Sequence, residues 1–228
     1  MELAFDIRNQ PLGDSAVLVT LSENITPETA DRVLALDQAL RAAQIEGVVD
    51  CVPAYTSLLV KYDPAKIEFE HLKKKILSIK FRSRDANKTK SRRIEIPVRY
   101  GGDQGPDLEN VAGLTGLTTE EVIRLHCSAE YTVCFIGFLP GFPYLSGMDP
   151  RLAASRLATP RQLVPAGSVG IAGSQTGIYP LDSPGGWRII GRTTLTIFDP
   201  RCEPPVLLKA GDRIKFIPVA GGEEINGS

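Results

Sequence analysis

The feature that most constrains the fold of this chain is a glycine-rich stretch from Val164 to Thr194. Seven glycines occur in it, at positions 167, 170, 173, 177, 185, 186 and 191. A helix cannot carry glycine and proline at this density, because each glycine costs about 1 kcal/mol and each proline about 3 kcal/mol relative to alanine. The stretch therefore predicts short strands in which glycine marks bulges and tight corners.

A phosphate-binding loop is the first functional alternative for this stretch, and the sequence excludes its standard form. Such a loop needs a lysine and a helix directly after the glycines. No lysine lies between Lys90 and Lys209, and no helical pattern follows the glycines. A serine nucleophile is disfavoured as well, because neither Ser168 nor Ser174 stands in a G-x-S-x-G frame. Two interpretations stay open, a tight barrel corner and the floor of a ligand pocket.

Composition bounds the remaining choices. The chain has 228 residues, 43% hydrophobic content and a formal net charge of −1, which gives no field that favours nucleic acid or a membrane. The cysteines are scattered without a C-x-x-C pair and there are two histidines, so neither a zinc site nor a disulfide framework is expected. We find no signal-peptide pattern and no apolar run near the ~20 residues of a membrane span. These features favour a cytoplasmic protein without a metal.

The first half predicts a small α+β domain over residues 1–80. Thr26 and Pro27 are typical of a helix N-cap and first turn, and Gly47 is the expected end of that helix. A second amphipathic helix is expected over 69–79. Strands are expected at 16–21, 48–53 and 57–62.

A basic segment follows at residues 81–93. The stretch Lys80–Arg93 holds seven lysines and arginines against one aspartate and few apolar residues. A patch for nucleic acid or an acidic partner is one interpretation, and a solvated linker between domains is the favoured one.

The second half, residues 94–228, predicts a mostly-β domain with one clear helix. Thr118 and Glu121 form a capping-box pattern at the start of that helix. Short β patterns separated by Gly, Pro and Asp surround it, which is typical of a closed or nearly closed barrel. Those patterns are RIEIPVRY, YTVCFIGFL, SVGIAG, RIIGRT, LTIFD and DRIKFIPV.

Polar side chains within the glycine-rich stretch favour the pocket interpretation. Gln175, Tyr179 and Arg192 stand where glycine allows a ligand to approach the backbone. They offer an amide, a phenol and a planar guanidinium that suits a carboxylate. We expect this set to bind a small polar acid or amide, or a segment of a partner chain.

Several long motifs resemble one known family. They are YGGDQGPDL, LHCSAEYTV, FIGFLPGFPYLSGMDPRL, TPRQLVPAGSVGIAGSQTGIYPLDSPGGWRIIGRT and the closing FDP…PPVLLKAGDRIKFIPV. Together they resemble the Kip-inhibitor family, also called the allophanate hydrolase subunit 1 family, which includes the B subunit of 5-oxoprolinase. The resemblance covers essentially the whole chain, and Arg99 is a departure, since a small or thiol residue is expected there.

The resemblance implies a fold, partners and an activity. The second half is expected to be a cyclophilin-like β-barrel. The expected partners are the homologous C subunit of 5-oxoprolinase and an A subunit of the LamB/YcsF type, in a complex that hydrolyses 5-oxo-L-proline to L-glutamate with ATP. ATP is expected to be used by the complex and not bound by this chain alone. Two alternatives stay open: an inhibitor of a sporulation-type histidine kinase, and a component of an allophanate or urea amide-hydrolysing system.

Further side chains become candidates within this frame. His126 ends a helix and is expected either as a catalytic acid or base or as a histidine satisfied by backbone carbonyls. Arg161 is expected to bind a substrate carboxylate or to close an ion pair. Phe142, together with Tyr144 in the same PGFPYL motif, is a pocket wall or core residue, and Trp187, the only tryptophan, is a ligand wall or a partner anchor. Asp107 is expected to be a turn or cap residue.

Overall fold

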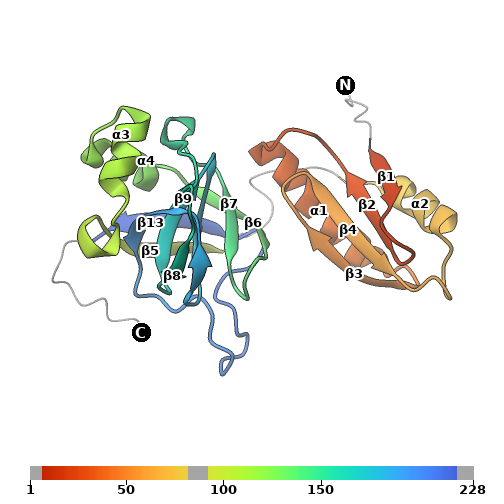
Figure 1. Ribbon diagram of the computed structural model, residues 1–228. Coiled ribbons are helices and arrows are strands. Elements are labelled where there is room, and N and C mark those ends of the chain that lie inside the picture. Colours follow the sequence, from red (N-terminus) through yellow and green to blue (C-terminus); the bar gives the residue numbers. More distant parts are fainter. Residues whose placement is uncertain (1–6, 82–91, 220–228) are drawn as a thin grey trace. The chain divides into compact units, whose positions relative to one another are not determined.

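The computed structural model describes residues 7–81 and 92–219, and the chain divides into two compact units, Met1–Lys90 and Ser91–Ser228 (Figure 1). Residues 82–91 of the expected linker lie outside the described residues. We describe each unit by itself.

The N-terminal unit is a four-stranded antiparallel sheet with two helices, and its strand order is β1-β2-β4-β3. Its elements are β1 (Arg8–Pro11), β2 (Ala16–Thr20), α1 (Pro27–Ala43), β3 (Val48–Pro53), β4 (Ser57–Tyr62) and α2 (Phe69–Ser78). The register places Val17 beside Val60, and both pack in one buried cluster with Leu36 of α1 and Leu72 of α2. Both helices therefore cover the same face of the sheet.

Local signals set the limits of α1. The Thr26 side chain accepts a hydrogen bond from the Thr29 backbone N–H at 3.1 Å, and Pro27 opens the first turn, as the sequence predicts. The expected end at Gly47 is wrong. The helix stops at Ala43, because Gln44 adopts the left-handed conformation with φ 44°.

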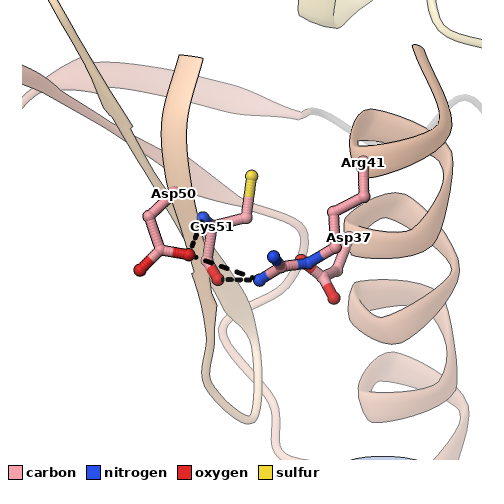
Figure 2. A network of polar contacts seen from close by, with 4 residues as sticks. All are labelled: Asp37, Arg41, Asp50 and Cys51. Carbon is pink, nitrogen blue, oxygen red and sulfur yellow. Dashed lines mark hydrogen bonds and ion pairs between the residues drawn. The ribbon is translucent and has the colours of Figure 1, made fainter. Parts of the chain in front are cut away.

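A polar network joins α1 to the edge strand β3 (Figure 2). Arg41 Nε donates to Asp37 Oδ1 at 2.9 Å, and its guanidinium also donates to the Cys51 carbonyl and lies 3.5 Å from Asp50 Oδ1. Asp50 accepts a hydrogen bond from the Cys51 backbone N–H at 2.8 Å. Burial raises the pKa of the Cys51 thiol to about 11, so this cysteine stays protonated and unreactive at neutral pH.

The second unit contains a closed seven-stranded barrel with the order β10-β7-β6-β13-β5-β12-β9, which confirms the predicted barrel. The pair β13–β5 is parallel, and the other pairs in the ring are antiparallel. The strands of the ring are β5 (Arg93–Tyr100), β6 (Tyr131–Ile136), β7 (Pro143–Ser146), β9 (Ser168–Ala172), β10 (Gln175–Ile178), β12 (Arg188–Arg192) and β13 (Arg213–Pro218). A separate two-stranded sheet pairs β8 (Arg161–Val164) with β11 (Ser183–Gly185).

Two α-helices accompany the barrel, where the sequence predicted one. The predicted helix is α4 (Thr119–Ser128), and both hydrogen bonds of its capping box are present between Thr118 and Glu121, at 2.9 and 3.2 Å. The missed helix is α3 (Leu108–Thr115), which is short and carries an internal glycine. In Figure 1 both helices lie beside the barrel, where α3 contacts β12 and α4 contacts β13. Single 3₁₀ turns occur at Gly102–Gln104 and Pro150–Leu152.

The strand predicted at residues 195–199 is wrong. That segment forms a single isolated bridge, Phe198 with Val206, and no regular strand. Within the glycine-rich stretch the structure has β9, β10, β11 and β12 and no helix, which confirms the prediction of short strands.

Candidate functional site

An aromatic pocket of about 280 Å³ lies where the glycine-rich stretch meets the segment before β7. Its floor consists of Phe142, Tyr179 and Trp187, which are 1%, 1% and 6% exposed. The ring centroid of Phe142 lies 5.3 Å from those of both Tyr179 and Trp187, and the ring planes cross at 86° in each pair. Edge-to-face packing of this kind holds the three rings in fixed orientations.

Two glycines make room for this floor. A Cβ on Gly177 would meet the Phe142 ring at 3.0 Å, and one on Gly185 would collide with the Tyr179 ring and hydroxyl. The Trp187 backbone also lies close enough to the Tyr179 phenol to lower its pKa, against the larger upward effect of burial. Gly177 and Gly185 thus serve close packing of aromatic rings.

The sides of the aromatic pocket come from Tyr144 and from Phe138 and Arg156, two residues that the sequence did not single out. Phe138 is 63% exposed, adopts a φ of 67° and meets Phe142 edge-on at 5.5 Å. Tyr144 forms a half-buried wall, and Arg156 is exposed at the mouth. The F-x-x-x-F-x-Y spacing of the aromatic side chains was the available signal for Phe138, whereas nothing local marks Arg156.

A second, polar pocket of about 590 Å³ lies beside β12. Its lining includes Arg99, Gln104, Arg192 and the threonines of 193–196. Arg192 Nε donates to the Ala166 carbonyl at 2.7 Å, which fixes the direction of its guanidinium. Two arginines and several hydroxyl groups suit an anion with more than one acceptor oxygen.

His126 lies in the interior of the barrel unit and is 0% exposed. Its Nδ1 is 2.7 Å from the Tyr100 hydroxyl and its Nε2 is 3.0 Å from Thr176 Oγ1, while its ring packs 4.4 Å from that of Phe216. Burial lowers the pKa of His126 to about 3, so the ring is neutral at pH 7. The His126 ring lines neither pocket, and no part of it is exposed to a substrate. Its catalytic role stays a prediction.

Arg161 forms an ion pair. Its Nη2 lies 2.7 Å from Oδ1 of Asp107, a buried carboxylate whose Oδ2 accepts the Ile189 backbone N–H at 2.6 Å. The other guanidinium nitrogen, Nη1, is buried without a hydrogen-bond partner among the described residues. Asp107 is the N-cap residue of α3, as expected, but its side chain bridges to β12 instead of capping the helix.

The structure therefore divides the predicted site residues between two places. Phe142, Tyr179 and Trp187 share the aromatic pocket, and Arg192 lines the polar pocket. Gln175 begins β10 opposite Ala172 and lines neither of the two. Whether these residues bind substrate stays a prediction.

A protein-family comparison now gives this architecture a name. The model of the carboxyltransferase domain, subdomain C and D, matches residues 7–208. The chain belongs to this family.

Curated relatives in the family resemble the chain over nearly its full length. The B subunit of 5-oxoprolinase from Bacillus subtilis (strain 168) is 42% identical over 221 residues, which is 92% of each chain. The B subunit of 5-oxoprolinase from Escherichia coli O157:H7 is also 42% identical, over 92% of this chain and 95% of that protein. These matches confirm the resemblance drawn from the motifs.

Solved structures of the family agree with the fold. PH0987 from Pyrococcus horikoshii is 48% identical over 94% of this chain and 98% of its own, with a TM-score of 0.58. TTHA0988 is 40% identical over 90% of this chain with a TM-score of 0.77, and the match covers 40% of that longer chain.

Two further observations concern the residues of this chain that the structure describes. No described helix has both the length and the apolar character to cross a membrane. Within residues 7–81 and 92–219, no cluster of three or more His, Cys, Asp or Glu side chains is placed to hold a metal ion.

Proposed function

We propose that the chain is the B subunit of an ATP-dependent 5-oxoprolinase, a cytoplasmic complex that hydrolyses 5-oxo-L-proline to L-glutamate. One observation carries this proposal: relatives with that name are 41–42% identical over more than nine-tenths of both chains. Identity at this level along the whole length favours a shared role over a shared fold alone.

The chemistry of lactam hydrolysis suggests which step this chain contributes to. A lactam resists water because its amide is stable, and transfer of a phosphoryl group from ATP to the lactam oxygen makes that oxygen a leaving group. The chain has no lysine-bearing phosphate loop, so ATP binding belongs to the assembled complex. We propose that this chain handles the lactam, within a cyclophilin-like barrel joined to the α+β domain of residues 1–80 by the basic linker 81–93.

The names of these relatives support an assembly of several different proteins, because each relative is one of the subunits of its enzyme. We propose that the partners are the homologous C subunit of 5-oxoprolinase and an A subunit of the LamB/YcsF type, and that the chain is inactive alone. The relatives give no support for a histidine kinase as partner.

A second candidate function rests on more distant relatives. The urea amidolyase of Saccharomyces cerevisiae is 27% identical over 96% of this chain, which spans 14% of that protein. This match keeps an allophanate or urea amide-hydrolysing role as the alternative. Its lower identity and the small share of the relative that it covers make it the weaker candidate.

Co-expression with the two proposed partners tests the proposal. The purified complex is assayed for ADP and glutamate formation with 5-oxo-L-proline, and with allophanate and urea as competing substrates. We expect ATP hydrolysis that depends on 5-oxo-L-proline in the complex and none with the chain alone. Turnover of allophanate without turnover of 5-oxo-L-proline would select the alternative.

A further inference from the structure

The aromatic pocket has the properties of a site for a small ring that carries a negative charge. Its volume of about 280 Å³ lies at the small end of ligand sites and suits a single five-membered ring. The floor rings of Phe142, Tyr179 and Trp187 are held edge-to-face, so aromatic surfaces meet at different angles around one space. The CH₂ edges of a saturated ring can pack on such surfaces.

The charge around the pocket favours a negatively charged ligand. Arg156 lies at the mouth, and no Asp or Glu is among the residues that line the pocket. Arg156 is close enough to lower the pKa of both Tyr144 and Tyr179, against the larger upward effect of burial, and Arg161 also acts on Tyr179. Arg156 is the charged side chain among the lining residues, whereas Arg161 lies outside the lining and is paired with Asp107. The Arg156 guanidinium repels a cation and attracts a carboxylate.

Hydrogen-bonding groups at the rim suit an amide. Tyr144 contributes a phenol whose pKa burial raises, so it stays protonated and can donate a hydrogen bond. Gly186 leaves part of the opposite wall without a side chain, whereas the Tyr179 ring covers Gly185. The polar pocket differs, since it is larger and is lined by two arginines and several threonines with one aromatic ring, that of Phe198.

We propose that the aromatic pocket binds the five-membered lactam acid, with the ring on Phe142, Tyr179 and Trp187 and the carboxylate at Arg156. This inference rests on the proposed function, and it assigns the substrate to this pocket and not to the polar pocket that contains Arg192. Tyr144 and Gly186 then face the amide group.

The single tryptophan makes the proposal directly measurable. Trp187 forms part of the floor, so its fluorescence reports on this pocket alone in the isolated chain. We expect a saturable change on titration with 5-oxo-L-proline, a much weaker response to 2-pyrrolidinone, which lacks the carboxylate, and no saturation with ring-opened L-glutamate. Arg156→Gln is expected to weaken binding of 5-oxo-L-proline about tenfold or more and to leave the 2-pyrrolidinone response unchanged.

Kinetics of the assembled complex separate this inference from the proposed function. Arg156→Gln is expected to raise the KM for 5-oxo-L-proline about tenfold with the KM for ATP unchanged, whereas Arg151→Gln, an exposed arginine paired with Asp149, changes neither. An unchanged KM in an active complex, or no saturable fluorescence change, overturns the pocket assignment and leaves the function standing. Saturable binding at Trp187 with no 5-oxo-L-proline turnover upholds the pocket and overturns the function.

Discussion

The two units of the chain each contain an arginine–aspartate network, and the two networks differ in how far water reaches them. In the barrel unit, the Asp107 side chain is 9% exposed and receives both the Arg161 guanidinium and the Ile189 backbone N–H. In the N-terminal unit, the side chains of Arg41 and Asp50 are 53% and 48% exposed, so water competes for the contact between them. Loss of the buried pair is therefore expected to lower the free energy of unfolding more than loss of the exposed pair. The reason is that water does not reach a buried group that has lost its partner.

The largest effect is expected at the buried network. Asp107→Ala leaves the Ile189 N–H and part of the Arg161 guanidinium without an acceptor and is expected to lower the unfolding free energy of the barrel unit by about 3 kcal/mol. Urea unfolding followed by Trp187 fluorescence measures this, because that tryptophan belongs to the barrel unit. Asp199→Ala, which breaks an aspartate–arginine contact with the exposed Arg201, is the matched control and should cost less than about 1 kcal/mol. Equal losses of unfolding free energy in Asp107→Ala and Asp199→Ala would show that burial does not make the Asp107 pair the more stabilising one.

A pH titration extends the comparison to His126, a buried side chain that is neutral in the folded protein at pH 7. Burial lowers the pKa of His126 from 6.5 to about 3, so the unfolded chain takes up a proton before the folded chain does. The contribution of neutral His126 to the free energy of unfolding is complete above pH 6.5. It is lost as the pH falls toward 3, by at most about 1.4 kcal/mol per pH unit. Urea midpoints between about pH 7 and 4 measure the slope.

Variants of the two histidines test the source of that slope. His126→Gln retains hydrogen-bonding groups toward Tyr100 and Thr176 and removes the titrating ring, so it should flatten the pH dependence. His71→Gln, on the exposed surface of α2, should leave the dependence as it is. A wild-type slope in the His126 variant would assign the proton uptake to another group.

Glycine packing in the aromatic pocket gives the next smaller effect. Gly185→Ala places a methyl group against the Tyr179 ring and is expected to destabilise the barrel unit by about 1–3 kcal/mol. Gly186→Ala is the neighbouring control, because its Cβ would meet its nearest atom, in Pro160, at an ordinary 3.6 Å. Urea unfolding by circular dichroism compares the two, and a tolerated Gly185→Ala would mean that Tyr179 can move aside.

Local signals predicted local structure well in this chain. Thr26 with Pro27, and Thr118 with Glu121, mark helix starts through contacts within a few residues, and these appear in the structure. The density of short β patterns predicted the barrel. Strand pairing was not predictable in the same way, since β5 pairs in parallel with β13, far along the chain.

The site was predictable by residue type but not by grouping. Tyr179 was expected to share a pocket with Gln175 and Arg192. The structure instead groups it with Phe142 and Trp187, while Arg192 lines a different pocket and Gln175 lines neither. The direction of a strand side chain depends on register, and one residue of shift reverses it, so sequence spacing alone could not sort these side chains. His126 shows the same limit, because its ring meets Thr176, 50 positions away.

The smallest effect is expected in the exposed network of the N-terminal unit (Figure 2). Arg41→Gln removes the charge beside Asp37 and Asp50 and keeps a donor that can be directed to the Cys51 carbonyl. Burial already raises the pKa of Asp37, against the downward effect of Arg41, so this carboxylate loses a favourable neighbour while water still reaches the network. We expect a loss of less than about 1 kcal/mol that shrinks further in about 1 M salt, where the Debye length falls to about 3 Å. Hydrogen exchange of the α1 and β3 amides measures it, and a salt-independent loss as large as that of Asp107→Ala would mean that the Arg41 network is shielded from water after all.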